Sequence, residues 1–405
     1  MGFVTGFRGL RDGFQVPIAL AEAGMLDGFV TDLYVGWPER VLGRALPARR
    51  AEQLLARHDG RLDGQPVLPM RGLALREKLA TLGGIAPDEL YARFDPAYGH
   101  AMARAARRHR SDLLCYSAYA PSAFSAEYDH RPRKILFQYH PHYVLEDRIL
   151  VEDAHAAEQG GQAINTAKPV SGFATHRSRL ASDDAWRLAD HIVCASSFTR
   201  RSLVEAGADA DRISVISYGV ELPTPIKIVR PGHFQALFVG SGFRRKGLHH
   251  LLAAWRAADL APGSTLTVVA RVIEPDLLEM VRQTPATEYR AGVSSAELAT
   301  LYATASLFVM PSLVEGFGQV YLEALASGLP VLGTPNTALP DLGSEEDGVF
   351  IVPAGNPTAL AEMLGRQSHL IDADPAIRIA ARATAARFDW AKFRTGVAEI
   401  ASNAG

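Results

Sequence analysis

The sequence predicts two α/β domains, each built on a parallel β-sheet covered by helices. The chain has 405 residues, enough for two domains of ordinary size that each bury a core. Apolar residues make up 48% and charged residues 21%, close to globular averages, so disordered, collagen-like and coiled-coil proteins are excluded. Along most of the chain, short β-branched or aromatic runs alternate with stretches of helical period, the pattern of parallel sheets covered by helices.

Six short apolar runs in the first half predict strands: GFVTGF, GFVTDLYV, DLLCYS, RKILFQYH, HIVCAS and ISVISYG. The stretch from Gly36 to about Gly84 interrupts this rhythm with proline, glycine and arginine. We expect an insertion with some helix there, rather than another β-α unit.

A change in sequence composition after Gly219 predicts the boundary between the domains. The segment VELPTPIKIVRPG holds three prolines, which disfavour both a helix and a central strand. We interpret it as the linker, with residues 1–222 as the first domain and 223–388 as the second. A second strand series follows in QALFVGS, STLTVVAR, ATEYRAG, LFVMPS, PVLGT and GVFIVP, separated by helices.

The tail is helical in pattern, with a break expected around Phe388 to Trp390. Its last helix, 389–405, carries Trp390, Phe393, Val397 and Ile400 at spacings of three and four. This gives one apolar face that needs a surface to pack against. We expect the helix to return to the first domain.

The charge distribution is uneven. A net charge of -2 argues against nucleic acid as the main partner, yet residues 40–110 carry 14 Lys/Arg against 7 Asp/Glu. These basic residues form either a face for an anionic membrane surface or a solvated helix face. The arginines concerned are Arg40, Arg44, Arg49, Arg50, Arg57, Arg61, Arg107, Arg108 and Arg110.

The cysteines and the N-terminal residues give no sign of secretion. Cys115 and Cys194 each lie in a short apolar run, where a cysteine usually behaves as a small buried hydrophobe. No charged-then-apolar leader follows Met1, and no apolar run approaches the roughly 20 residues that span a bilayer. We expect a cytoplasmic protein, peripheral to the inner face of the plasma membrane if the basic segment binds lipid.

The segment from Pro311 to Thr334 carries the clearest functional pattern. It reads as strand, loop, helix and strand, with Gly328 and Pro330 ending the helix. Such a loop lies at the carboxyl edge of a parallel sheet, where ligands of α/β proteins bind beside helix N-termini that suit phosphate. The sequence therefore predicts an anionic ligand at this edge.

Two glutamates flank this loop and helix. Glu315 precedes the helix and Glu323 lies inside it, so we expect both carboxylates to face one cavity. Carboxylates beside a diphosphate are repelled unless they bond to other groups, and ribose and sugar hydroxyls are suitable donors. Gly316 and Gly318, which flank Phe317, would let a diphosphate approach the backbone. The alternative is a helix-terminal charge plus a solvated glutamate.

This segment, EGFGQVYLEALASGLPV, resembles the E-x7-E signature of family 4 retaining glycosyltransferases, and VPAGNPTALAEML fits the segment that follows it in that family. The resemblance covers most of Gln235 to Leu364 closely and the first half loosely. It implies a GT-B fold, in which two Rossmann-like parallel-sheet domains face each other across a cleft. It also implies that Glu323 binds the donor ribose and Glu315 the transferred hexose.

A second pattern, FVGSGFRRKGLHHLL, reads as strand, glycine turn and helix. Arg245 and Lys246 would face a ligand at the sheet edge and stabilise the negative charge that develops on a departing nucleoside diphosphate, so we expect no metal and no further cofactor. Lys246 matches the lysine of the family pattern, whereas Ser241 replaces its arginine. The loop is similar to a variant in the lipopolysaccharide-core glucosyltransferases of the same family, which makes Arg245 the expected substitute. Arg244 is either solvated or part of the site.

In the first half, GFRGLRDGFQVPIALAEAG places a glycine-rich loop between the first strand and its helix. Gly13 is the candidate for the donor phosphate there, although the family usually has adjacent glycines. Arg8 and Arg11 either bind the donor phosphate or the acceptor, or point to solvent.

Two histidines follow a strand in FQYHPHY. The resemblance implies that the histidine at this strand end contacts the transferred sugar, and His140 lies nearer to the strand than His142. The alternatives are a structural histidine, or a His-x-His metal site, which lacks further ligands in the sequence.

Together with these observations, the resemblance implies a retaining hexosyltransferase. It would use a UDP-sugar, or a GDP-sugar, and a glycan or lipid-linked acceptor in cell-surface polysaccharide or lipopolysaccharide synthesis. Two alternatives stay open: a non-hydrolysing sugar-nucleotide 2-epimerase of the same architecture, and a non-catalytic nucleotide-binding module.

Overall fold

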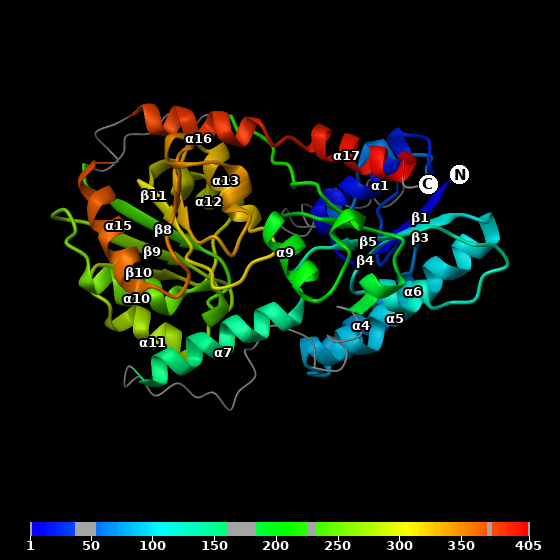
Figure 1. Cartoon of the computed structure of the whole chain (residues 1–405), viewed down its shortest axis with the longest axis horizontal. Coiled ribbons are helices and arrows are strands. Elements are labelled where there is room, and N and C mark those ends of the chain that lie inside the picture. Colours follow the sequence, from blue (N-terminus) through cyan, green and yellow to red (C-terminus); the bar gives the residue numbers. More distant parts are fainter. Residues whose placement is uncertain (1, 37–53, 160–183, 225–231, 371–374, 404–405) are drawn as a thin grey trace.

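The structure is a computed structural model that describes residues 2–36, 54–159, 184–224, 232–370 and 375–403. Two α/β bodies lie side by side, each around its own parallel sheet (Figure 1). The strand order is β3-β2-β1-β4-β5-β6-β7 in the first sheet and β10-β9-β8-β11-β12-β13 in the second. The expected fold class, two Rossmann-like domains in a GT-B arrangement, is confirmed.

The first sheet contains all six strands expected from the apolar runs. Its strands are β1 (Phe3–Phe7), β2 (Leu26–Thr31), β3 (Val67–Pro69), β4 (Asp112–Tyr116), β5 (Lys134–Gln138), β6 (His191–Cys194) and β7 (Ile213–Val215). Its helices are α1 (Gln15–Glu22), α4 (Arg71–Leu82), α5 (Pro87–His109), α6 (Ala120–Phe124), α7 (Tyr143–Gln159) and α9 (Ser197–Glu205). Every residue of β1 and β4 is buried, because helices cover both faces of a parallel sheet.

The expectation of an insertion without a further β-α unit between Gly36 and Gly84 was wrong. This stretch contributes the edge strand β3, which pairs with β2, and the helix α4 after it. β3 is only three residues long, its last two residues are exposed, and it ends in a proline. It therefore lacks the apolar run by which the central strands are recognised. Residues 37–53 lie outside the described part of the chain.

The second sheet and its helices follow the predicted order. The strands are β8 (Gln235–Val239), β9 (Thr265–Val269), β10 (Thr287–Arg290), β11 (Leu307–Val309), β12 (Val331–Gly333) and β13 (Val349–Ile351). The helices are α10 (Leu248–Ala257), α11 (Pro275–Gln283), α12 (Ser295–Thr304), α13 (Gln319–Ala326), α14 (Leu339–Leu342), α15 (Pro357–Leu370) and α16 (Ala376–Ala386).

In each sheet the strand order reverses at one point, and this decides where a ligand can enter. The reversal falls between β1 and β4 in the first sheet and between β8 and β11 in the second. Connections leave two adjacent strands there in opposite directions, which opens a crevice at the carboxyl ends of the strands. The loops after β8 and β11 carry the two patterns found in the sequence.

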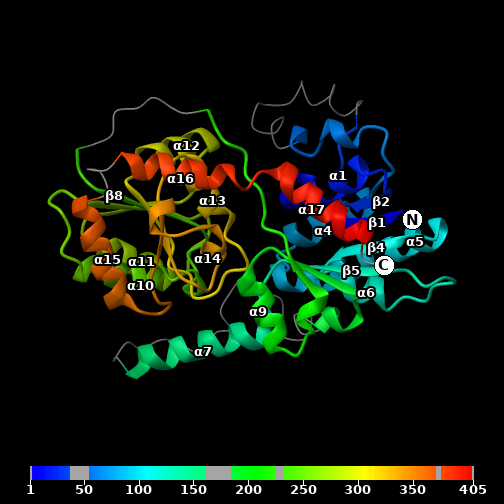
Figure 2. The ribbon, with the colours of Figure 1, turned by 45° about the horizontal axis from the view of Figure 1, so that its top comes forward.

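Two chain segments cross between the domains at the same place. The amide of Val220 donates to the carbonyl of Phe388 at 2.9 Å. A Cβ on Gly219 would overlap the backbone of Trp390, so the two crossings are in backbone contact. Figure 2 shows α16 and α17 (Trp390–Asn403) on either side of this crossing.

α17 returns to the first domain, as its apolar face predicts. Phe393 and Val397 are buried, and Arg394 Nε pairs with Glu22 of α1 at 2.7 Å. At the end of the helix, Arg133 donates to the carbonyl of Ala401 at 2.9 Å.

Truncating Phe393 should weaken this attachment. We expect Phe393→Ala to destabilise the protein by about 3–5 kcal/mol, because it leaves a cavity among buried aromatic rings. Urea unfolding monitored by tryptophan fluorescence measures the change. Glu399→Ala, an exposed position on the same helix, is the control and should leave the midpoint in place. Equal midpoints for the two variants would contradict the packing of α17.

Candidate functional site

The loops after β8 and β11 are in direct contact. Gly247, which starts α10, has φ +71°, and a Cβ there would overlap the carbonyl oxygen of Pro311. Only glycine fits this position, because both its backbone angle and its contact exclude a side chain. The amide of Leu313 donates to the carbonyl of Arg245 at 2.8 Å and ties the two loops together.

Three of the predicted site residues meet at this junction. Lys246 Nζ contacts the carboxylate of Glu315, and Arg245 Nη1 lies 3.5 Å from the same oxygen. The three side chains are between 12% and 16% exposed, so this ion cluster is largely shielded from water. Charges in such surroundings interact more strongly than they do in water.

The protonation of Lys246 depends on opposing effects. Burial and the adjacent Arg245 guanidinium lower the pKa of Lys246 well below its usual value. Contact with the Glu315 carboxylate acts in the opposite direction and favours the ammonium form. When its contact with Glu315 keeps Lys246 protonated, the cluster holds two cations against one anion, an arrangement that suits an additional anionic ligand.

Glu323 has a partner of its own outside this cluster. Tyr302 on α12 donates to Glu323 Oε2 at 3.1 Å. Burial raises the pKa of Glu323, and the Tyr302 hydrogen bond offsets part of that effect. The two carboxylates thus have different surroundings: Glu315 faces cations, and Glu323 faces a hydroxyl donor.

The glycine loop between the two glutamates lies against the first domain. The hydroxyl of Ser196 donates to the carbonyl of Gly316, and that of Thr199 does so at 3.2 Å. A Cβ on Gly316 would overlap the carbonyl oxygen of Tyr139, so this glycine is required for the close approach of the two domains. The next residue, Phe317, packs edge-on against the ring of Tyr218, with centroids 5.2 Å apart.

Gly318 completes the loop at the start of α13. It has φ +86°, and no side chain caps the helix that begins after it. The first amides of α13 therefore lie beside the Gly316–Gly318 backbone, as the sequence predicted for an anion-binding helix start.

The loop that holds Gly13 is strained. Asp12, Gly13 and Phe14 all have positive φ values, of 51°, 56° and 64°. A left-handed conformation at a residue other than glycine costs on the order of 1–3 kcal/mol and is frequent at functional sites. Asp12 is held by a hydrogen bond from the Tyr116 hydroxyl, and burial raises the pKa of this carboxyl.

The two loop arginines do not point to solvent. Arg8 pairs with Glu77 and lies 3.5 Å from Asp95. Arg11 stacks on the ring of Tyr139, 3.9 Å from its centroid. Arg244 of the second domain is likewise engaged, with Asp276 and Glu274.

The two histidines after β5 differ in their surroundings. The backbone of His140 lies next to Gly316, and its Nε2 is 3.3 Å from the hydroxyl of Ser117. His142 is 2% exposed, and burial lowers its pKa to about 4. His140 is therefore at the domain junction, whereas His142 is a buried histidine of the first domain.

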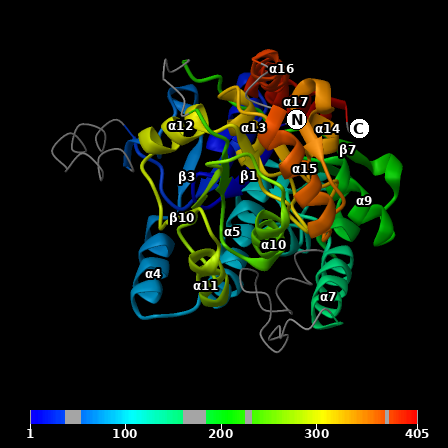
Figure 3. The ribbon, with the colours of Figure 1, turned by 90° about the vertical axis from the view of Figure 1, so that its left-hand side faces the viewer.

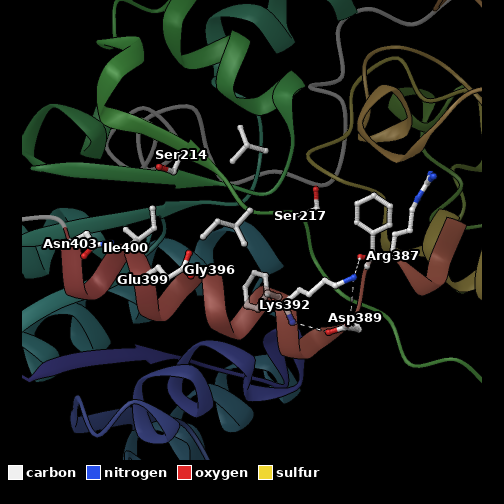
Figure 4. A pocket seen from close by; sticks show the side chains of 13 residues that line it. Ser214, Ser217, Arg387, Asp389, Lys392, Gly396, Glu399, Ile400 and Asn403 are labelled. Atoms are coloured by element: carbon white, nitrogen blue, oxygen red, sulfur yellow. Dashed lines mark hydrogen bonds and ion pairs between the residues drawn. The ribbon is translucent and has the colours of Figure 1, made fainter.

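A hollow on another part of the surface involves none of these residues. It lies between β7 and α17 and is lined by Ser214, Ser217, Lys392 and Glu399 among others (Figure 4). Lys392 Nζ donates to the carbonyl of Arg387 at 2.9 Å within it. The hollow lies at the chain crossing. It therefore belongs to the region that connects the domains and not to the site around Glu315 and Glu323.

Several residues at the site carry no signal in the sequence. Tyr302, Ser196 and Thr199 come from helices whose patterns predict only packing. Asp12 and Tyr116 meet from positions 104 residues apart. No spacing rule connects such pairs, so only the folded chain identifies them.

Two family models match the chain. The model described as "Glycosyl transferases group 1" matches residues 233–367, and the model described as "Glycosyltransferase Family 4" matches residues 40–223. The glycogen synthase of Mycobacterium tuberculosis strain H37Rv is 27% identical over 75% of this chain and 74% of its own length.

Solved structures show the same fold. HepE of Anabaena, determined in complex with UDP and glucose, superposes with a TM-score of 0.62 at 15% identity and covers all of both chains. WaaG, described as a glycosyltransferase involved in lipopolysaccharide biosynthesis, gives 0.61 at 15% identity over 99% of this chain and 100% of its own. Models and structures together support a glycosyltransferase with the GT-B fold.

The partly buried carboxylate of Glu323 should reduce stability when it is ionised. A carboxyl whose pKa is raised in the folded state favours folding most when protonated, and this advantage is lost as the pH rises through the folded pKa. Glu323→Gln removes the charge and keeps an acceptor for Tyr302. We expect the variant to melt above the wild type at pH 8, with a smaller difference at pH 5.

The same substitution should weaken nucleotide binding by about tenfold, since a hydrogen bond to a charged acceptor is worth about 1.5–3 kcal/mol. Differential scanning fluorimetry and calorimetric titration with UDP measure the two effects. Glu362→Gln, exposed on α15, is the control. A variant that is less stable at pH 8, or that binds UDP as the wild type does, would contradict the assignment.

Proposed function

We propose that this chain transfers a hexose from a nucleotide-diphosphate sugar, with UDP-sugar as the first choice of donor, and that the anomeric configuration is retained. The observation that carries the proposal is the cluster of Lys246, Arg245 and Glu315 at the point where the strand order of the second sheet reverses. HepE, which shares the fold, was crystallised with UDP and glucose, and this supports a uridine nucleotide.

Each residue of the cluster has a role in the proposal. Lys246 and Arg245 bind the diphosphate oxygens and stabilise the charge that develops when the sugar leaves. Glu315 accepts hydrogen bonds from hexose hydroxyls, and Glu323 accepts them from the ribose. Gly316, Phe317 and Gly318 supply backbone for close approach, and Gly13 does so from the first domain.

The reaction itself forms the bond from the acceptor oxygen to the anomeric carbon while the bond to the diphosphate breaks. The acceptor proton passes to an oxygen of the departing phosphate, on the face from which the acceptor attacks. This scheme requires neither a metal ion nor a protein general base. His140 contacts the transferred sugar from the first domain, and its backbone position beside Gly316 supports this role.

For the acceptor we propose a glycan or a lipid-linked sugar used in cell-surface polysaccharide or lipopolysaccharide synthesis. The likeness to WaaG supports this choice. An acceptor of this kind also agrees with action of the enzyme at the inner, cytoplasmic face of the plasma membrane. No helix among the described residues is long and apolar enough to cross a bilayer.

The exposed face of α4 supports contact with a membrane surface. Leu75, Leu79 and Leu82 are 60%, 58% and 76% exposed and lie on one side of the helix. Figure 3 shows α4 at the edge of the molecule. Of the arginines considered for an anionic surface, Arg57 and Arg110 are already paired with carboxylates. The exposed leucines of α4 therefore support membrane contact more strongly than Arg57 and Arg110 do, because these two arginines already pair with carboxylates.

The reaction is tested with purified protein and a panel of UDP- and GDP-sugars. Incubation with donor alone should give slow hydrolysis, and addition of acceptor should give a product whose anomeric proton coupling matches the donor. Lys246→Met should lower kcat by about 10²–10³. Arg366→Met, an exposed residue paired with Glu345, is the matched control.

Three results would reject the proposal in favour of another. Epimerised nucleotide sugar from donor alone indicates the 2-epimerase. Nucleotide binding without turnover on any donor indicates a binding module. An inverted product linkage excludes retention.

Membrane contact is tested by co-sedimentation with vesicles. We expect the wild type to bind vesicles that contain phosphatidylglycerol more strongly than neutral ones, and increasing salt should reduce the difference. Leu75→Ser combined with Leu79→Ser should reduce binding several-fold. Leu370→Ser, 57% exposed on α15, is the control. Binding that is unchanged in the double variant would rule out α4 as the contact.

A further inference from the structure

A cluster of three metal-ligating side chains joins the two domains at a distance from the chain crossing. Asp153 lies on α7 of the first domain, and His249 and His250 lie in the first turn of α10 in the second. Figures 1 and 2 show α7 extending from the first domain along the second. Asp153 Oδ2 is 3.1 Å from Nε2 of His249, and Oδ1 is 2.6 Å from Nε2 of His250.

The packing around α7 fixes the position of Asp153. One face of this helix presents Leu145, Ile149 and Asp153, spaced four residues apart. Leu145 and Ile149 pack with Leu313 of the second domain in a small apolar cluster. The side chain of Asp153 is 10% exposed, and that of His249 is 4% exposed. The carboxylate is therefore held at the rim of an apolar contact rather than in solvent.

Among the described residues, no lysine or arginine forms an ion pair with Asp153. In the part of the chain that the structure describes, the ion pairs of Asp153 involve only the two histidines. Arg244, whose charge affects His249, is itself paired with Asp276. The backbone at Gly355, which carries no charge, also approaches Asp153 Oδ1.

The donor atoms of the three side chains face one point. Nε2 of each imidazole is turned toward the carboxylate of Asp153, and each carboxylate oxygen contacts a different histidine. Imidazole nitrogens and carboxylate oxygens are the donor types from which divalent metal sites are built.

The geometry also suits a metal. The three donor atoms lie within 4.8 Å of one another, and this is the only such group of three among the described residues. Ligands about 2.0–2.2 Å from a zinc ion are roughly 3.3–3.5 Å apart, so the present spacings need to open by less than about 1 Å. Two imidazoles and a carboxylate favour Zn²⁺, Co²⁺ or Ni²⁺ over Mg²⁺ or Ca²⁺.

We propose that Asp153, His249 and His250 bind a divalent transition-metal ion, with Zn²⁺ as the best fit, and that this ion clips α7 to α10 across the domain interface. The fourth ligand is water. The ion takes no part in the transfer reaction and replaces the shared hydrogen bonds with stronger coordination. Since α10 begins two residues after Lys246, the clip holds the start of the candidate donor site against the first domain.

One feature limits the affinity. Coordination through Nε2 places the imidazole proton of His249 on Nδ1, and this atom is buried without a hydrogen-bond partner among the described residues. A buried N–H without an acceptor is unfavourable and weakens binding. We therefore expect micromolar binding, weaker than that of structural zinc sites.

The test uses full-length protein stripped with EDTA and titrated with Co²⁺ and Zn²⁺ in the absence of donor. The expected result is one equivalent of Co²⁺ with visible d–d absorption, displaced by Zn²⁺, and a rise in melting temperature with Zn²⁺. Asp153→Asn keeps an acceptor for the histidines, and His250→Asn removes one ligand. Both should weaken Co²⁺ binding at least tenfold. His155→Ala, exposed on the same helix, is the control and should bind as the wild type does.

Two outcomes would overturn the proposal. If stripped wild-type protein gives no d–d absorption, the three residues form a hydrogen-bonded contact only. If Asp153→Asn and His250→Asn bind Co²⁺ as tightly as the wild type, the metal sits elsewhere. Because the readout needs neither donor nor acceptor, its failure is separate from any failure of the proposed transferase activity.

Discussion

The contact that the rest of the site depends on is the carbonyl of Gly316, which accepts hydrogen bonds from Ser196 and Thr199 of the other domain. It occurs in the middle of the loop that holds Glu315, so the position of this carboxylate is set by both domains at once. A side chain at 316 would separate them, because the Cα packs on the carbonyl of Tyr139. One small residue therefore determines how closely the domains approach.

The shielding of this junction from water also determines how the charged side chains of the site interact. With Lys246 protonated, Lys246 and Arg245 carry one positive charge more than Glu315 neutralises, in surroundings with little water. A buried excess charge is costly unless it is paired. In the proposed function a diphosphate provides the missing negative charge, which would free Glu315 to bond to sugar hydroxyls instead of to Lys246. The ion pair between Lys246 and Glu315 would thus be replaced when a donor binds. The free energy of donor binding would then position the donor as well as neutralise the buried charge.

The sequence predicted the parts of the molecule that repeat a physical pattern. Buried parallel strands give continuous apolar runs, and the glycines at 247 and 316 stand where the backbone needs them, so both sheets and the two donor loops were found. The edge strand β3 was missed because an exposed three-residue strand has no apolar run. Tyr302 and Ser196 were missed for a different reason. Their contacts join elements distant in the chain, and no local pattern encodes such a meeting.

The contacts between the two domains differ in kind along the interface. These differences bear on how the domains could move apart. At the crossing of residues 219–220 and 388–390, backbone lies on backbone, so this is the point at which we expect a rotation of the domains to pivot. At Gly316 the contact consists of neutral hydroxyl bonds, which exchange for water at little net free energy. At Asp153 an ionised carboxylate is shared by two imidazoles. Both contacts join the same two sheets, so an opening of the interface would affect both of them. A cation bound at Asp153, as proposed above, would favour the closed arrangement, because it adds coordination bonds to one of these two contacts.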